Sequence, residues 1–315
     1  MFGSALDYSP LSYRHDMSSV EMIQQFDLSE YPLWTALITP FTPQDTVDFD
    51  ALAQLVAEQV SANNGILLLG STGEGLALTE AEQKDIVTFV CQLAPQVPLM
   101  VAVGGFNLKQ QVQWLEFCND LPIHAYLLGS PLYAKPGVQG QTQWFDTLLS
   151  HSKHPCMLYN VPGRSAVAIA PQVLKNLSHH STLWAMKEAS GDIAKFEAFR
   201  LAAPQLAIYS GDDALMPYFA QAGAKGLVSV AANAWPTQTA EFVRRSLAGT
   251  YPNLFSQWSS AINSLFEVAN PIPVKVLMHK QGRIQQPDLR PPLTHLELNN
   301  HAALEAANHT ILSFN

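Results

Sequence analysis

The sequence predicts an α/β protein, a (β/α)₈ TIM barrel with a C-terminal helical appendage. Eight short apolar runs rich in Val, Ile and Leu alternate with stretches of helical periodicity, and about 215 residues suit eight strand–helix units. A doubly wound sheet would also alternate, but no glycine-rich dinucleotide-binding turn follows the first run. Hydrophobic residues make up 48% of the 315-residue chain, which is ample for a core.

The predicted strands are the apolar runs at 34–39, 65–70, 98–104, 125–129, 156–161, 183–188, 206–210 and 226–231. The first predicted helix, at 48–64, carries Leu52, Leu55 and Val56 on one face, and the second opens at a capping box at 79–82. Further helical patterns cover 107–119, 140–151, 171–179, 192–203, 214–222 and 237–248.

Three regions are expected along the chain. Residues 1–30 lack clear periodicity and are predicted to be a mobile N-terminal extension, and residues 31–250 form the barrel. Residues 251–315 are predicted to form two or three further helices, one of them opened by Pro271 and Pro273.

Composition excludes several classes of protein. A net charge of −9 argues against a nucleic-acid partner, which needs a basic face. No apolar run approaches the ~18 residues of a membrane span, and the first thirty residues lack the apolar core of a signal peptide. The three cysteines share no metal or redox spacing, so a reduced, cytoplasmic location is expected. Charged residues are only 14%, which hints at surface buried between subunits.

Lys187 is the most informative residue at the rim where the strands end. It continues the apolar run at 183–186, where a barrel strand is buried on both faces. Burial favours the neutral form of an amine, and a neutral amine attacks ketones to form a Schiff base. The alternative is a structural lysine that reaches solvent or pairs with Glu188.

Tyr159 ends the neighbouring predicted strand, so its phenol is expected to point toward Lys187. A phenol can move protons during imine formation if other hydroxyls complete a relay, and Ser71 and Tyr133 are candidates for that relay. A single tyrosine is more often a core ring, but three hydroxyls and a lysine on one rim favour catalysis.

Other polar residues at or near the rim have simpler interpretations. Asp212 and Asp213 are expected to cap the helix that starts near Ala214. His151 and His154 are spaced like metal ligands but lie where a helix ends in a loop, and no metal site is predicted.

Five motifs in this order make the chain resemble the dihydrodipicolinate synthase family. The resemblance extends from about Tyr31 to the C-terminus, and the separation of 28 residues between Tyr159 and Lys187 also agrees with it. The motifs are Gly-Ser-Thr-Gly-Glu at 70–74, Tyr-Asn-Val-Pro-Gly-Arg at 159–164, Lys-Glu-Ala-Ser-Gly at 187–191, Ser-Gly-Asp-Asp at 210–213 and Asn-Pro-Ile-Pro-Val-Lys at 270–275.

The resemblance implies a Schiff-base lyase without a cofactor. Pyruvate would form an imine with Lys187, and the resulting enamine would attack L-aspartate-4-semialdehyde to give 4-hydroxy-tetrahydrodipicolinate, on the route to diaminopimelate and lysine. Thr72 and the backbone near Val228 would hold the pyruvate carboxylate, and Gly211 is a further implied substrate-binding residue. The implied relay is Tyr159, Ser71 and Tyr133, with Tyr133 acting in a neighbouring subunit of a dimer or tetramer. The family usually has threonine where this chain has Ser71.

Arg164 distinguishes the dihydrodipicolinate synthase family from related aldolases of the same superfamily. N-acetylneuraminate lyase and 2-keto-3-deoxy sugar-acid aldolases share the lysine and the tyrosine, but typically lack arginine at this position. A guanidinium there can bind the carboxylate of aspartate semialdehyde in a bidentate manner. Without the motif, Arg164 would be interpreted as a surface residue of a loop. A non-catalytic homologue that binds a keto acid is the remaining alternative.

The resemblance also predicts little or no inhibition by lysine. Asn107 alone matches the pattern of lysine-sensitive members, whereas Gln111 replaces a carboxylate and Leu132 replaces a tyrosine. Glu80 stands where a histidine would contact lysine, and its carboxylate could substitute. The positions implied to form the lysine site are Gly75, Leu76, Glu80, Gln83, Asn107, Gln111 and Leu132.

Overall fold

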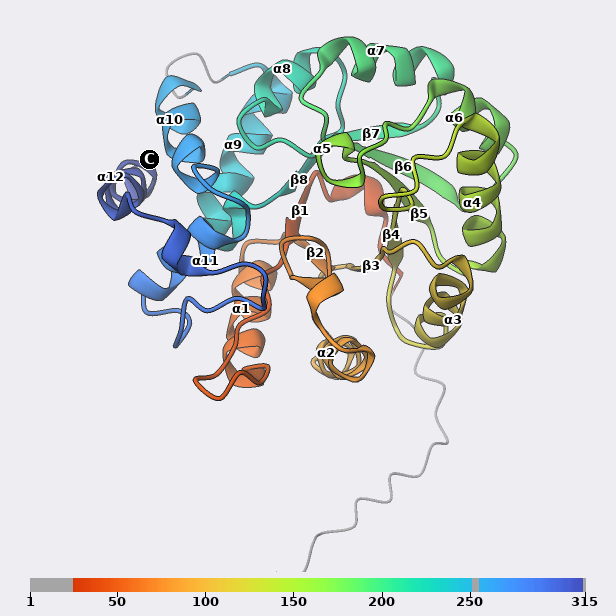
Figure 1. The fold of residues 1–315 in the computed structure, drawn as a ribbon. Helices are drawn as coiled ribbons and strands as arrows, with labels where there is room; N and C mark the ends of the chain where they lie inside the picture. Colours follow the sequence, from red (N-terminus) through yellow and green to blue (C-terminus); the bar gives the residue numbers. More distant parts are fainter. Residues whose placement is uncertain (1–24, 251–254, 314–315) are drawn as a thin grey trace, which may run out of the picture.

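The computed structural model describes residues 25–250 and 255–313, which form a closed barrel of eight parallel strands with helices around it (Figure 1). The strands pair in chain order, and pairing of β1 with β8 closes the ring. They are β1 Leu33–Ala36, β2 Gly65–Leu68, β3 Leu99–Val103, β4 Ala125–Gly129, β5 Cys156–Asn160, β6 Leu183–Glu188, β7 Ala207–Ser210 and β8 Gly226–Ser229. The predicted (β/α)₈ barrel is confirmed, strand by strand.

Each strand is followed by a helix on the outside of the barrel (Figure 1). A short additional helix, α5 (Pro162–Ser165), precedes α6 and was not predicted. The surrounding helices are α1 Phe49–Ser61, α2 Glu80–Gln92, α3 Leu108–Cys118, α4 Val138–His151, α6 Pro171–Leu177, α7 Ile193–Ala202, α8 Met216–Gln221 and α9 Pro236–Ala248.

Local sequence signals explain where several helices begin. Thr79 and Glu82 form the predicted capping box at the start of α2, in which each side chain accepts from the other residue's backbone N–H. Asp48 and Asn107 cap α1 and α3 through their side-chain oxygens. These caps satisfy N–H groups that the first helical turn leaves without partners.

The barrel interior is filled by large apolar side chains from the strands. Trp34 on β1 is fully buried, and its indole lies where a side chain at Gly65 would otherwise stand. A Cβ atom at Gly65 would lie 2.7 Å from the indole ring, so the neighbouring strand must carry glycine to accept Trp34. The core therefore depends on size matching between adjacent strands.

The C-terminal region adds three helices beside the barrel: α10 Phe255–Leu265, α11 Ile272–Lys280 and α12 His301–Leu312 (Figure 1). Lys275 on α11 is fully buried, and its Nζ lies 2.8 Å from a carboxylate oxygen of Glu74 in the loop after β2. The other oxygen of Glu74 accepts the backbone N–H of Arg290 at 2.7 Å. The appendage is therefore fastened directly to the carboxyl end of the barrel.

The predicted region boundaries fall partly outside the described residues. Residues 1–24 of the expected extension and residues 251–254 beside the expected end of the barrel lie outside them. Of the first thirty residues, 25–30 belong to the packed structure, where Leu28 is buried and the Phe26 ring contacts His124. Among the described helices, none combines the length and apolar character required to span a membrane.

Candidate active site

Lys187 and Tyr159 face each other across β5 and β6. The two residues are register partners, and the Lys187 ammonium nitrogen lies 4.4 Å from the centre of the Tyr159 ring. Lys187 is only 6% exposed, whereas Tyr159 is half-buried. The predicted juxtaposition of an amine and a phenol is thus present within a single chain.

The next register pair, Asn160 and Glu188, lies on the opposite face of the same strands, because side chains alternate along a strand. Asn160 donates its amide N–H to Glu188 at 2.6 Å, and Glu188 also accepts the backbone N–H of Ser190 at 2.7 Å. Glu188 therefore joins the ends of β5 and β6, and the alternative pairing with Lys187 is not observed. Within residues 25–250 and 255–313, no carboxylate lies within ion-pair distance of the Lys187 amine.

Gly211 lies directly against the Lys187 side chain at the end of β7. Its backbone N–H donates to the carbonyl of Glu188 at 2.7 Å, which continues the pairing of β6 with β7. Gly211 was predicted to bind substrate, and in the structure it lies beside the side chain of Lys187.

A cavity of about 660 Å³ opens at the carboxyl ends of the second to fifth strands. Three predicted site residues line it: Ser71 from the loop after β2, Tyr159 from β5 and Arg164 from α5. A cavity of this volume can hold two small carboxylic acids. Exposed apolar side chains, Leu76 and Phe106, also line it.

Asn270 connects two other predicted residues. Its side-chain amide donates to the hydroxyl of Thr72 at 3.0 Å, and its backbone carbonyl accepts from the Arg164 guanidinium at 3.0 Å. Thr72 is buried while Arg164 is exposed, so Asn270 links a hydroxyl under the mouth to a cation on its edge. This hydrogen bond holds one N–H group of the guanidinium in place and leaves its other N–H groups for a ligand.

Asp213 does not cap a helix, contrary to the sequence-based expectation. It is fully buried and accepts hydrogen bonds from the hydroxyl of Ser229 and from the backbone N–H groups of Val230 and Ala231. Burial raises the pKa of Asp213 to about 6. Asp212, as expected, accepts the backbone N–H groups at the start of the following turn. The two carboxylates differ because adjacent side chains of the turn point in opposite directions, and Asp213 points toward the end of β8.

Five predicted residues are not part of the cavity lining: Lys187, Thr72 and Gly211, whose positions are described above, and Tyr133 and Val228. Tyr133 is 90% exposed, so its side chain makes little contact with the rest of the chain that carries it. Val228 is buried in β8, where it pairs with Trp34 on β1. Their predicted functions are not tested by contacts within one chain.

The Dihydrodipicolinate synthetase family model matches residues 31–310. The chain belongs to this family. It is 42% identical over 283 residues to the 4-hydroxy-tetrahydrodipicolinate synthase of Wolbachia pipientis subsp. Culex pipiens, covering 90% of this chain and 96% of that protein. It is 47% identical over 277 residues to the enzyme of the same name from Francisella philomiragia, covering 88% of this chain and 94% of that protein.

Solved structures of the dihydrodipicolinate synthetase family share the fold. The chloride-inhibited dihydrodipicolinate synthase of Acinetobacter baumannii, complexed with pyruvate, matches with a TM-score of 0.83 and 28% identity, covering 90% of this chain and 99% of that chain. The Bacillus anthracis enzyme DapA-2 matches with the same TM-score and identity, covering 90% and 98%. The family and the enzymatic nature predicted from the motifs are confirmed.

Sequence reasoning gave no function to Asn160 or Asn270, although both stand inside motifs of the dihydrodipicolinate synthetase family. Asn160 directly follows Tyr159, and Asn270 is the first residue of the motif at 270–275; their membership of these motifs is the signal that the sequence offers. Their partners, Glu188 and Thr72, lie 28 and 198 residues away along the chain. Both contacts are therefore set by tertiary structure.

Proposed function

We propose that the chain condenses pyruvate with L-aspartate-4-semialdehyde to 4-hydroxy-tetrahydrodipicolinate, through an imine between pyruvate and Lys187. The observation that carries this proposal is the buried Lys187 amine, 4.4 Å from the Tyr159 ring centre and without a described carboxylate partner. The names of the relatives and the pyruvate in the Acinetobacter baumannii enzyme support it. The reaction needs no cofactor, because the imine itself supplies the electron sink.

The first half of the reaction uses Lys187 and Tyr159. The neutral amine of Lys187 attacks the ketone carbon of pyruvate, and the carbonyl oxygen leaves as water after it has received protons. The Tyr159 phenol, beside that amine, supplies a proton and recovers one through Ser71. Loss of a proton from the methyl carbon of pyruvate then converts the imine to an enamine.

The second half joins the two substrates. The enamine carbon attacks the aldehyde of the semialdehyde, and the amino group of that substrate then attacks the imine carbon, which closes the ring and releases Lys187. Thr72 and the backbone near Val228 hold the pyruvate carboxylate, and Gly211 binds substrate beside Lys187. Arg164, exposed on the cavity edge and fixed by Asn270, binds the carboxylate of the semialdehyde.

Tyr133 completes the proton relay in a second copy of the chain. Its exposure suits a residue that enters a neighbouring site, and the same contact would cover the exposed Leu76 and Phe106. The smallest active unit is therefore a dimer, and the assembly is a tetramer made of two dimers. The enzyme acts in the cytoplasm and needs neither a membrane nor a nucleic acid. Light scattering of the full chain tests the assembly, and a fully active monomer would contradict it.

A comparison of substrates tests the activity. Pyruvate with aspartate semialdehyde should give product in a coupled assay, while N-acetylneuraminate and 2-keto-3-deoxy sugar acids should give little turnover. Turnover of a sugar acid instead would assign the chain to the related aldolases. No turnover of any of these substrates, with no imine formed, would indicate a non-catalytic homologue that binds a keto acid.

A further inference from the structure

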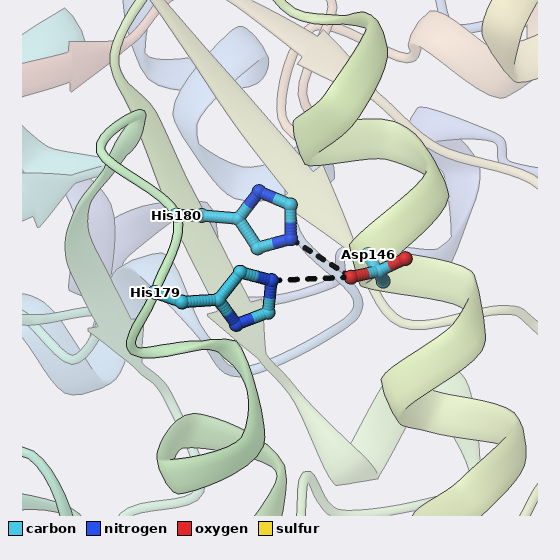
Figure 2. A group of neighbouring side chains, drawn as sticks. All are labelled: Asp146, His179 and His180. Carbon is cyan, nitrogen blue, oxygen red and sulfur yellow. Dashed lines mark hydrogen bonds and ion pairs between the residues drawn. The ribbon is translucent and has the colours of Figure 1, made fainter.

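A group of three potential metal ligands lies away from the proposed active site (Figure 2). Asp146 lies on α4, while His179 and His180 lie in the turn between α6 and β6. Turns that lead from a helix into the next strand lie at the amino ends of barrel strands, whereas the active site lies at the carboxyl ends. The group is therefore separate from the catalytic mouth.

Both imidazoles point to the same carboxylate oxygen (Figure 2). Nε2 of His180 lies 2.9 Å and Nε2 of His179 lies 3.6 Å from Oδ1 of Asp146, and all three ligand atoms lie within 4.8 Å of one another. A tetrahedral zinc ion with bonds of about 2.0–2.2 Å separates its ligands by about 3.3–3.6 Å. The His179 separation lies at the upper end of that range, and the His180 separation lies below it.

The protonation of His179 makes a cation at this place favourable. Its Nδ1 lies 3.0 Å from the backbone carbonyl of Asn176, and a carbonyl can only accept, so Nδ1 carries the proton. In a neutral imidazole, Nε2 then presents a lone pair to the Asp146 carboxylate. Two electron-rich atoms in this arrangement repel unless a proton or a metal ion lies between them. A hydrogen bond from Nδ1 to a backbone carbonyl is also the usual support of a metal-binding histidine.

The protein holds the three residues in place before any ion binds. The centres of the His179 and His180 rings lie 4.2 Å apart with the ring planes tilted by 37°, and the His180 side chain is only 12% exposed. Asn176, at the end of α6, donates to Thr142 on α4 at 3.1 Å. The turn that carries the histidines is therefore tied to the helix that carries the carboxylate.

We propose that Asp146, His179 and His180 bind a divalent transition-metal ion, with Zn²⁺ as the ion that fits best. Two imidazoles and one carboxylate are a common set of zinc ligands, and water fills the fourth position because His179 and Asp146 are open to solvent. Binding requires His180 in the tautomer with its proton on Nδ1, which frees Nε2 for the ion. The ion joins α4 to the turn before β6, and this inference does not depend on the proposed catalytic function.

Titration of the full chain with ZnCl₂ tests the site after removal of bound metal by a chelator. Isothermal calorimetry at neutral pH should show saturable uptake of one ion per chain, and the thermal midpoint should rise with Zn²⁺. Co²⁺ in the same site should give the visible absorption of a four-coordinate ion. Absence of uptake by the unaltered chain would overturn the proposal and leave a proton as the group between His179 and Asp146.

Variants locate the ion. Asp146→Asn and His179→Gln each remove one ligand from the surface and should weaken binding at least about tenfold, since even outer-shell changes cost 10–100-fold. His151→Gln is the matched control, because His151 lies on the same helix with its Nδ1 against the carbonyl of Thr147. Unchanged affinity in both ligand variants, or an equal loss in the control, would contradict the assignment.

Discussion

Gly211, directly after β7, lies so close to the Lys187 side chain that no side chain fits between them. A Cβ atom at Gly211 would lie 2.8 Å from Cε of Lys187 and 2.5 Å from Cβ of Ala189. The φ of Gly211 is not in the left-handed region, so this position requires glycine because of space and not because of backbone conformation. Gly211 thus positions the reactive amine, whether or not it also contacts substrate.

Gly211→Ala should therefore reduce activity while the chain remains folded. The added methyl group displaces the Lys187 side chain, and a displacement of about 1 Å at a reacting group can cost on the order of 100-fold in rate. The measurement is kcat/KM for pyruvate, with circular dichroism to verify folding. Gly137→Ala is the control, since a Cβ atom there meets nothing within 4 Å. Wild-type activity in Gly211→Ala would show that the amine tolerates displacement.

Arg164→Ala should raise the KM for aspartate semialdehyde far more than the KM for pyruvate. The guanidinium lies on the cavity edge, where it can bind the carboxylate of the second substrate, and it has no proposed contact with pyruvate. Steady-state kinetics with each substrate varied in turn separates the two constants. Equal changes in both would mean that Arg164 supports its loop through Asn270 and does not bind substrate.

Lysine should inhibit this enzyme weakly or not at all. Three polar side chains at the expected lysine site already make contacts within the chain. Glu80 pairs with Lys84 at 2.6 Å, and the amide of Gln83 donates to the carbonyl of Gly75 at 2.6 Å. The Asn107 side chain caps α3. At the remaining positions, neutral Gln111 and apolar Leu132 offer a lysine molecule no charge-assisted hydrogen bond, a contact that typically contributes about 1.5–3 kcal/mol.

Titration with lysine near the KM values of both substrates measures the inhibition. Two neutral replacements, Gln111 and Leu132, remove the carboxylate and the phenol expected in sensitive relatives. Half-inhibition at sub-millimolar lysine would refute the prediction, and Glu80→Gln would then test whether the carboxylate of Glu80 binds the ammonium group.

Glu74→Gln should destabilise the chain strongly. Lys275 is fully buried, and burial lowers its pKa; its Nζ has Glu74 as ion-pair partner at 2.8 Å. Removing one partner of a buried ion pair costs roughly 3–5 kcal/mol, because the other charge remains uncompensated. Chemical denaturation measures the free energy of unfolding. Glu305→Gln, which breaks the exposed pair with Lys280, is the control and should change it little. Similar changes in the free energy of unfolding for the two variants would show that the buried Lys275 side chain does not need the Glu74 carboxylate for the fold to be stable.

The fold was predictable because a barrel repeats one local pattern. Each strand is an apolar run that is largely buried, and several helices begin at a recognisable signal such as the capping box at Thr79. The short helix α5 was missed because four residues are too few for a periodic pattern. The hydrogen bond from the backbone N–H of Arg290 to the Glu74 carboxylate was not predicted. It joins residues 216 positions apart, and no local sequence pattern indicates such a contact.

The site was predictable only in part. The proximity of Lys187 and Tyr159 was predictable because a lysine within an apolar strand and a tyrosine at the end of the neighbouring strand are locally unusual. Asp213 was assigned wrongly because the sequence cannot show which carboxylate of an adjacent pair faces β8. The packing of Gly211 against Lys187 depends on the spacing of two strands, which only the three-dimensional structure provides.

Borohydride reduction in the presence of pyruvate tests the central claim most directly, because it traps an imine at the lysine that forms it. Peptide mass spectrometry should find the reduced pyruvate adduct on Lys187 alone, and Lys187→Ala should show no adduct while keeping its fold. An adduct on another lysine, or turnover of Lys187→Ala above about a hundredth of the wild-type rate, would contradict the assignment of Lys187 as the nucleophile.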